Sequence, residues 1–227
     1  MTPAPPRAAL FDLDGTLIDS APDLCASVNR VLATLGRPTV ELGAIQRMVG
    51  DGARVLVDRA LRATGSAPAP GLVDLALERF RADYERHAVV ETRPYPGAVQ
   101  ALDALAAAGW RLGICTNKPE RPARIVLGLL GIHDRFGAIV GGDTTPHRKP
   151  HPAPLHTALA ALDVAPGNAV LVGDGMHDRE AAEAAGVAFV GVRWGYGLAG
   201  LEAAGTEPLL GTFDDLARHL ARAPRKP

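Results

Sequence analysis

The sequence predicts an α/β protein in which a parallel β-sheet, covered by helices on both faces, is interrupted after its first strand by a helical insertion. Short apolar runs alternate with amphipathic stretches after residue 97, which is the pattern of βαβ units. Residues 20–91 show only helical periodicity. A short apolar run precedes this helical segment, so the insertion directly follows the first strand.

The N-terminal part of the chain begins with the apolar run 8–11, which predicts a buried strand that ends in an acidic loop. Ser20 predicts a helix start, because Pro22 stands in the first turn and Asp23 completes a capping box. Three stretches with apolar residues at helical spacing follow, near Leu24, Ala53 and Leu72. We therefore expect an all-helical cap domain over residues 20–91.

The rest of the chain predicts the remainder of the sheet. After a return hinge at residues 92–97, apolar runs predict four further strands, at residues 110–116, 138–141, 169–173 and 188–192. Helical stretches separate them, so residues 1–19 and 92–227 are expected to form one α/β core domain. Residues 194–197 are expected to form a loop after the last core strand, with the aromatic side chains packed.

The composition limits the classes of function. The chain has 227 residues, a net charge of −1, two cysteines and 4% aromatic residues. Near-neutral charge and few aromatics argue against nucleic-acid binding, and no apolar run reaches the roughly 18–20 residues of a membrane span. The first ten residues contain no apolar stretch typical of a secretory signal. We therefore expect a cytoplasmic protein, monomer or homodimer, with no nucleic-acid or membrane partner.

Polar side chains follow four of the predicted strands. They comprise carboxylates, a hydroxyl, an amide and one lysine: Asp12, Asp14, Thr116, Asn117, Lys149, Asp174 and Asp178. Ligands of open α/β sheets bind beyond the carboxyl ends of the strands, so we expect these side chains to meet at one edge.

These residue types indicate phosphoryl transfer. Converging carboxylates repel one another, and an all-oxygen set of ligands suits Mg²⁺. Lys149 adds positive charge, and Thr116 and Asn117 can donate to phosphate oxygens. A carboxylate attacks phosphorus once the substrate's charge is screened, and a second acid can protonate the leaving alkoxide. The expected partner is a small phosphorylated metabolite.

Four motifs occur in order along the chain and resemble those of the haloacid dehalogenase superfamily of phosphohydrolases. They are Phe11-Asp-Leu-Asp-Gly-Thr-Leu-Ile-Asp-Ser20, Cys115-Thr-Asn-Lys-Pro119, Arg148-Lys-Pro150 and Val172-Gly-Asp-Gly-Met-His-Asp178. The resemblance implies a Rossmann-like core in which Asp12 is the nucleophile that forms an aspartyl-phosphate and Asp14 is the general acid/base. It also implies that Thr116 and Lys149 hold the phosphoryl group. The implied Mg²⁺ ligands are Asp12, Asp14 through its backbone carbonyl, Asp174 and, in support, Asp178.

Within this superfamily the chain is most similar to phosphoglycolate phosphatases, above all in the cap loop Val49-Gly-Asp-Gly-Ala-Arg-Val-Leu-Val57. Glycines at 50 and 52 free backbone amides for a ligand, so Gly52 is a candidate substrate-binding residue. Arg54 or Arg47 could pair with a substrate carboxylate. Two positions depart from the pattern: Gly175 replaces the common Ser or Asp, and His177 stands where a smaller polar residue is usual, which leaves a place for His177 in the metal shell open.

Other functions remain compatible with parts of this pattern. A phosphatase for another small substrate, such as N-acetylmuramate 6-phosphate or a sugar phosphate, and a phosphomutase would carry the same core motifs. A receiver-type signalling domain also forms an aspartyl-phosphate. Receivers, however, have no helical insertion after the first strand and carry the phosphate-accepting Asp on a middle strand, so this alternative is disfavoured.

Overall fold

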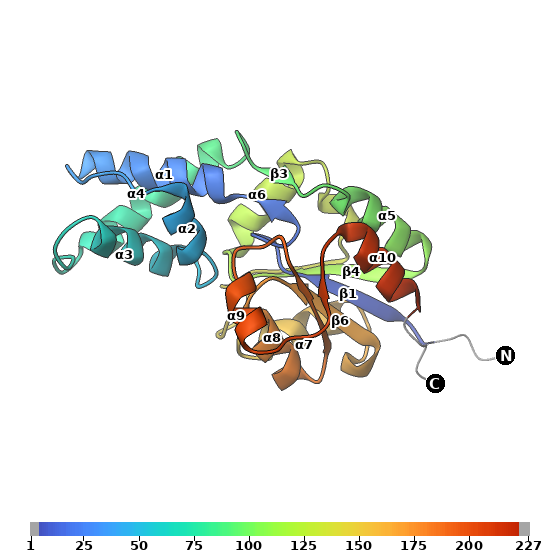
Figure 1. The fold of residues 1–227 in the computed structure, drawn as a ribbon. Helices are drawn as coiled ribbons and strands as arrows, with labels where there is room; N and C mark the ends of the chain where they lie inside the picture. The colour runs from blue at the N-terminus through green and yellow to red at the C-terminus, as the bar shows by residue number, and fades with distance from the viewer. Residues whose placement is uncertain (1–4, 223–227) are drawn as a thin grey trace.

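The computed structural model describes residues 5–222 and contains a six-stranded, fully parallel sheet (Figure 1). The strand order is β5-β4-β1-β6-β7-β8. The strands are β1 (Arg7–Phe11), β4 (Trp110–Cys115), β5 (Ala138–Val140), β6 (Ala169–Gly173), β7 (Ala188–Val192) and β8 (Leu209–Leu210). The predicted α/β fold with a parallel sheet is confirmed.

The register of β4, β1 and β6 places the carboxyl ends of these three strands side by side at one edge of the sheet. Phe11 of β1 lies opposite Ile114 of β4 and Val172 of β6. The next residue, Asp12, therefore leaves the sheet between the ends of β4 and β6. This register brings the segments after β1, β4 and β6 to one edge, as the sequence predicted.

Helices cover both faces of this sheet. Because side chains alternate along a strand, Ala9 and Phe11 of β1 belong to one apolar cluster, and Ala8 and Leu10 to another. The first cluster includes α5 (Ala98–Ala107), α6 (Glu120–Leu129) and α10 (Phe213–Arg222). The second includes α7 (Ala153–Ala161) and α8 (Met176–Ala185), while α9 (Leu198–Ala203) and the 3₁₀ turns His133–Arg135 and Pro166–Asn168 lie in connections.

Four helices lie beside the sheet and are here called the cap (Figure 1). They are α1 (Ala21–Thr34), α2 (Leu42–Met48), α3 (Ala53–Ala63) and α4 (Leu72–His87). Val28, Val57 and Phe80 are buried where α1, α3 and α4 pack together. Apolar residues at helical spacing thus form the interior of the cap.

The chain enters and leaves the cap through one strand pair, here called the neck. In the neck, β2 (Ile18–Asp19) runs antiparallel to β3 (Arg93–Pro94), with Ile18 opposite Pro94. The buried carboxylate of Asp23 accepts hydrogen bonds of 2.8–3.0 Å from the backbone amides of residues 90–92. On this basis we propose the division into a cap domain, residues 20–91, and a core domain, 1–19 and 92–227, whose first four and last five residues lie outside the described part.

The structure corrects several local predictions. Ser20 precedes α1, but its hydroxyl donates to Asp14 at 2.6 Å, and Asp23 binds residues 90–92, so the predicted capping box is wrong. Residues 194–197 follow β7, which is not the last strand, because β8 adds to the sheet beyond it. The sequence analysis did not predict α2, α9, α10, β2, β3 and β8. Among the described residues, no helix has the length and hydropathy needed to cross a membrane.

Candidate active site

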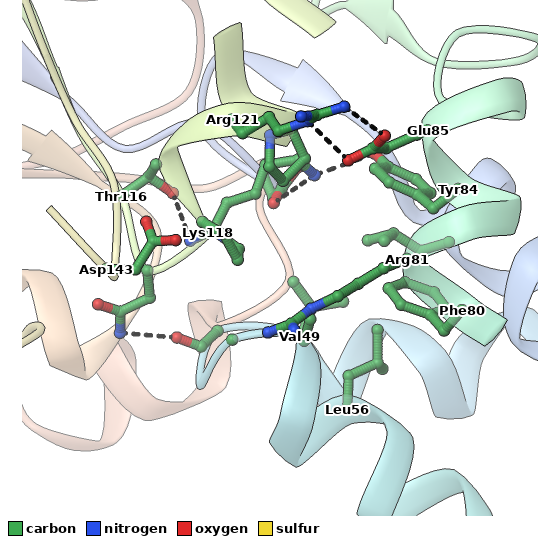
Figure 2. Close-up of a pocket in the computed structure, with 18 of the residues that line it drawn as sticks. Val49, Leu56, Phe80, Arg81, Tyr84, Glu85, Thr116, Lys118, Arg121 and Asp143 are labelled. Atoms are coloured by element: carbon green, nitrogen blue, oxygen red, sulfur yellow. Dashed lines mark hydrogen bonds and ion pairs between the residues drawn. The ribbon is translucent and has the colours of Figure 1, made fainter. Parts of the chain in front are cut away.

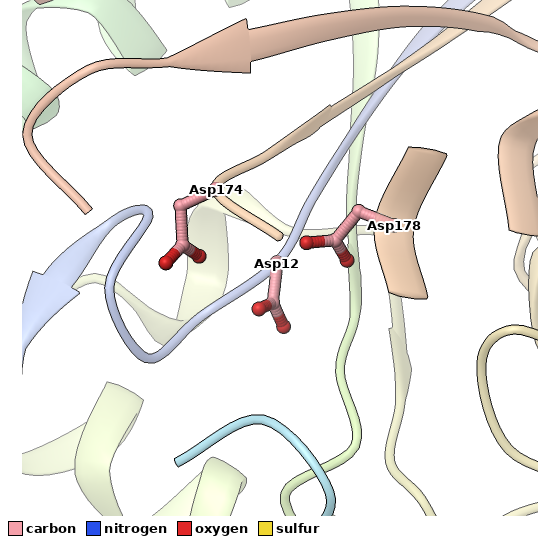
Figure 3. A group of neighbouring side chains, drawn as sticks. All are labelled: Asp12, Asp174 and Asp178. Carbon is pink, nitrogen blue, oxygen red and sulfur yellow. The ribbon is translucent and has the colours of Figure 1, made fainter. Parts of the chain in front are cut away.

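Three carboxylates meet at the carboxyl edge of the sheet (Figure 3). Asp12 follows β1, Asp174 follows β6, and Asp178 lies in the first turn of α8. One carboxylate oxygen from each lies within 4.8 Å of the other two. Asp174 and Asp178 are buried, and Asp12 is largely buried. The predicted convergence of these acids therefore takes place.

This cluster has the properties of a cation site. Burial raises the pKa of Asp12, although Lys149 opposes the shift. Burial and the charges of Asp12 and Asp178 raise the pKa of Asp174 to about 7. Oδ1 of Asp12 is buried, and no donor of the described residues is in hydrogen-bond geometry with it. A divalent cation relieves all three conditions, since it neutralises the acids and can take Oδ1 of Asp12 as a ligand.

Lys149 lies between two of these acids. Its Nζ donates to Oδ1 of Asp178 at 2.5 Å and to the carbonyl oxygen of Cys115 at 2.6 Å, and lies 3.1 Å from Oδ1 of Asp12. The residue is only 2% exposed. Burial alone lowers the pKa of a lysine, but Asp12 and Asp178 outweigh it and raise the pKa of Lys149, which therefore stays charged.

The loop after β7 holds Asp174 in place. Backbone amides of Tyr196 and Gly197 donate to Oδ2 of Asp174 at 2.8 and 3.2 Å, and the Thr16 hydroxyl donates to Oδ1 at 2.9 Å. A side chain at 195 would stand 2.1 Å from Cβ of Asp174, so this close approach requires Gly195. The sequence analysis expected only packing here; the glycines on both sides of Tyr196 were the available signal of a closely approaching loop.

Asp14 turns toward the cap instead of joining the three clustered carboxylates. Its carboxylate accepts hydrogen bonds from the Ser20 hydroxyl at 2.6 Å and from Nζ of Lys118 at 3.0 and 3.1 Å. Nζ of Lys118 also donates to the hydroxyl of Tyr84 on α4 at 2.9 Å. Asp14 is thereby held beside the cluster. The sequence analysis missed Lys118 and Tyr84, because only the packed cap brings them together.

A cavity of about 300 Å³ lies between the core and the cap (Figure 2). Its core side is polar and includes Asp12, Asp14, Thr116, Asn117 and Lys118. Its cap side is mainly apolar, with Val49, Ala53, Leu56, Phe80 and Tyr84, and also carries Arg81 and Glu85. Enclosure between two units and a mostly apolar wall with few polar groups are typical of a small-molecule site.

Further contacts around the cavity join the cap to the core. Nδ2 of Asn117 donates to the carbonyl oxygens of Gly50 at 2.9 Å and Lys149 at 3.0 Å. Both amide hydrogens of Asn117 thus bind backbone, so the expected donation from this amide to a phosphate oxygen requires them to be released. Arg121 of α6 pairs with Glu85 of α4 at 3.0 Å.

His177 also contributes to this closure. Its Nε2 lies 2.8 Å from Oδ1 of Asp51 in the cap loop, and Arg59 holds the other oxygen of Asp51 at 2.7 Å. The imidazole faces the cap loop, and His177 is not part of the carboxylate cluster.

The other predicted substrate residues divide into two groups. Gly52 lines the cavity, with a φ of +84° and a hypothetical Cβ 3.2 Å from the carbonyl oxygen of Asn117, and Thr116 lies on the cavity floor. Arg54 instead pairs with Asp74 at 2.5 Å, has a side chain that is 56% exposed, and does not line the cavity. Arg47 is exposed and does not line it either.

Comparisons with known proteins agree with this geometry. Residues 9–192 match the family model described as haloacid dehalogenase-like hydrolase. The phosphoglycolate phosphatase of Rhodospirillum rubrum is 44% identical over 93% of this chain and 88% of its own length. That of Colwellia psychrerythraea is 41% identical over 94% of this chain and 96% of its own length.

A comparison with solved structures points to the same family. The crystal structure of a predicted phosphoglycolate phosphatase from Haemophilus somnus superposes with a TM-score of 0.89 and 30% identity, covering 95% of this chain and 98% of that one. Sequence motifs, sheet topology and relatives all agree, and the resemblance seen in the sequence is confirmed. The chain belongs to the haloacid dehalogenase-like hydrolase family.

Proposed function

We propose that this protein is a Mg²⁺-dependent phosphoric monoester hydrolase that converts 2-phosphoglycolate to glycolate and phosphate through an aspartyl-phosphate at Asp12. One observation carries the reaction class: Asp12 lies at the floor of the cavity between cap and core, flanked by Lys149 and two further buried carboxylates. The substrate is inferred from relatives that are phosphoglycolate phosphatases at 41–44% identity. A cytoplasmic location belongs to the same proposal.

In the first step, a carboxylate oxygen of Asp12 attacks phosphorus, and the bond between phosphorus and the glycolate oxygen breaks. Asp14 gives its proton to the departing alkoxide, which leaves as glycolate. Lys149 and the Thr116 hydroxyl hold the oxygens of the phosphoryl group during the transfer. A cationic Lys149 stabilises the charge that develops on those oxygens.

In the second step, Asp14 takes a proton from water, and the resulting oxygen attacks the phosphorus of the aspartyl-phosphate. The bond between phosphorus and Asp12 breaks, so inorganic phosphate leaves and the carboxylate is restored. Lys118, whose Nζ lies within 3.0–3.1 Å of both oxygens of Asp14, holds this carboxyl group in position for the transfer.

The proposed Mg²⁺ ligands are Asp12, Asp174, Asp178 and the backbone carbonyl of Asp14. When bound there, Mg²⁺ supplies positive charge that screens the phosphate dianion from the attacking carboxylate. The choice of Mg²⁺ rests on the all-oxygen donor set, which contains no thiolate or imidazole.

Asp12→Asn tests the proposal, because the change is nearly isosteric and removes the nucleophile. We expect phosphatase activity to fall on the order of 10⁴-fold or more, with the thermal unfolding midpoint close to that of the wild type. Initial rates are measured with and without Mg²⁺ on phosphoglycolate, sugar phosphates and N-acetylmuramate 6-phosphate. Asp103→Asn, at an exposed ion pair with Arg135, is the matched control.

The panel separates the competing functions. Full activity of Asp12→Asn removes this residue from the mechanism. A higher kcat/KM for a sugar phosphate or N-acetylmuramate 6-phosphate than for phosphoglycolate identifies that compound, instead of phosphoglycolate, as the preferred substrate. Isomerised phosphosugar without free phosphate identifies a phosphomutase.

A further inference from the structure

Three cationic side chains line the cavity, and two of them are neutralised by carboxylates of the protein. Lys118 pairs with Asp14, and Arg121 pairs with Glu85. The third is Arg81, whose guanidinium has no ion-pair or hydrogen-bond partner among residues 5–222. Among the described residues, Arg81 is therefore the one cation lining the cavity that no carboxylate pairs with.

Arg81 is placed to use this charge inside the cavity. It lies on α4, one residue after Phe80 and one turn before Tyr84, both of which also line the cavity. Figure 2 shows its side chain reaching from α4 across the cap side, so that the guanidinium ends near Val49. The residue is exposed and lines the cavity together with the core residues named above.

The Arg121–Glu85 pair keeps Arg81 available. Glu85 stands four residues after Arg81 on the same helix, the spacing at which opposite charges normally pair. Arg121 of the core holds Glu85 instead, with contacts of 3.0 and 3.1 Å to its two oxygens. The contact between cap and core thus occupies Glu85, one of two glutamates about one turn from Arg81 on α4; the other, Glu78, forms no ion pair with Arg81.

From this arrangement we infer that Arg81 is the specificity-determining residue of the cavity and binds the carboxylate of a small phosphorylated acid whose phosphoryl group lies at Asp12. The inference rests on the proposed function and deepens it. A guanidinium carries the charge opposite to that of a carboxylate and forms two parallel hydrogen bonds with it. Binding completes the pairing of every cation that lines the cavity.

The remaining cap wall favours a short acid over a sugar. Val49, Ala53, Leu56 and Phe80 offer no side-chain donors or acceptors to hydroxyl groups. Hydroxyl groups of a sugar phosphate that face these four side chains would have no hydrogen-bond partner there, which costs free energy when they are buried. The volume, about 300 Å³, also lies at the small end of the range for ligand cavities.

Arg54 is the natural control. It lies in the same cap and was the sequence-based candidate for this role, but Asp74 pairs with its guanidinium at 2.5 Å. Removal of Arg54 deletes a cation of the cap that is already neutralised. Removal of Arg81 deletes the unmatched one.

The experiment compares the wild type, Arg81→Met, Arg81→Lys and Arg54→Met on two substrates of the same skeleton. One is 2-phosphoglycolate, and the other is 2-hydroxyethyl phosphate, which has a neutral alcohol in place of the carboxylate. For phosphoglycolate we expect Arg81→Met to lower kcat/KM roughly ten- to hundredfold, mainly through KM. Arg81→Lys is expected to recover part of the loss, while hydroxyethyl phosphate hydrolysis by all variants changes less than about threefold.

A second measurement does not depend on phosphoglycolate turnover. Glycolate is tested as an inhibitor of hydroxyethyl phosphate hydrolysis, and we expect inhibition of the wild type and of Arg54→Met but much weaker inhibition of Arg81→Met. Equal losses on both substrates, or an Arg54→Met effect as large as that of Arg81→Met, overturn the role of Arg81. A wild type that does not prefer phosphoglycolate to hydroxyethyl phosphate overturns the proposed substrate instead, so the two failures are distinguishable.

Discussion

The two sides of the cavity are built differently. On the core side, Lys149, Asp174 and Asp178 are almost completely buried, and each has two or three partners. Between cap and core the contacts are mixed: the hydrogen bond between Lys118 and Tyr84 is buried, whereas two ion pairs are open to water, since the side chain of Arg121, which pairs with Glu85, is 77% exposed and that of His177, which meets Asp51, is 39% exposed. Exposed ion pairs contribute about 0–1 kcal/mol each, whereas breaking a buried pair costs about 3–5 kcal/mol.

This difference separates reaction chemistry from substrate choice. The groups that we propose to attack phosphorus and hold the metal are fixed by the sheet edge and by each other. The groups that we propose to recognise the rest of the substrate stand on a unit whose ion pairs with the core are exposed and therefore individually weak. Variants on the two sides are therefore expected to differ in size and in kind of effect.

Lys149→Met is expected to have the largest effect. It leaves Asp12 and Asp178 buried without their cation, so we expect loss of phosphatase activity and a fall of about 3–5 kcal/mol in the free energy of unfolding without added metal. Denaturant unfolding measures this change. Arg135→Met, at an exposed pair with Asp103, is the control and should cost less than about 1 kcal/mol. Equal stability of the two variants would mean that the core side is no more tightly built than the surface.

The pH dependence of the metal-free protein comes next in size. The pKa of Asp174 is about 7 in the folded protein, against an ordinary value of 3.8, so the folded state keeps a proton that the unfolded chain has lost. The free energy of unfolding should therefore fall as pH rises from about 4 to 7. Thermal unfolding in a chelator measures this slope. Asp174→Asn should flatten it, and Mg²⁺ should stabilise the protein more at pH 8 than at pH 5; the opposite slope contradicts the burial of an uncompensated acid.

Tyr84→Phe is expected to have an intermediate effect, because it removes a single hydrogen bond between the sides. Nζ of Lys118 loses its hydrogen bond of 2.9 Å to the Tyr84 hydroxyl but keeps its hydrogen bonds to both oxygens of Asp14. We expect a cost of about 1 kcal/mol in stability and a severalfold loss of kcat. Steady-state rates with saturating substrate measure the latter. An unchanged kcat would show that Lys118 positions Asp14 without help from the cap.

His177→Ala should have the smallest effect. Asp51 keeps Arg59 as its partner, so we expect less than about 1 kcal/mol in stability and less than about a threefold change in kcat/KM. The apparent affinity for Mg²⁺, measured by titration of activity, should stay the same. A clear loss of Mg²⁺ affinity would instead assign His177 to the metal shell.

The sequence was most informative where local patterns decide the structure. The central strands are continuous apolar runs, and the parallel topology brings Asp12, Asp174 and Asp178 together once those strands are assigned. The two-residue strands β2, β3 and β8 are too short to show any periodicity. The apolar residues of α10, at 213, 216 and 220, do follow helical spacing, so the same type of pattern could have predicted that helix.

Long side chains in the cap and at its border with the core were the least predictable part. Arg54, Arg81 and Arg121 look alike in the sequence, and each can pair with any acid within several ångströms. Their partners depend on how helices from different parts of the chain pack: Arg54 meets Asp74 and Arg121 meets Glu85, while Arg81 forms no ion pair with any of the described residues. No local signal carries that information.

The neck has a consequence for how this architecture can be altered. Ile18 and Pro94 face each other across an antiparallel pair, so both ends of the insertion leave the sheet-bearing unit about 5 Å apart. A tight turn of two residues can bridge such a gap, as in any hairpin. A helical bundle of different size can therefore be joined at this junction while the strand order of the sheet stays the same. The cap can then be exchanged without displacing Asp12, Asp174 and Asp178.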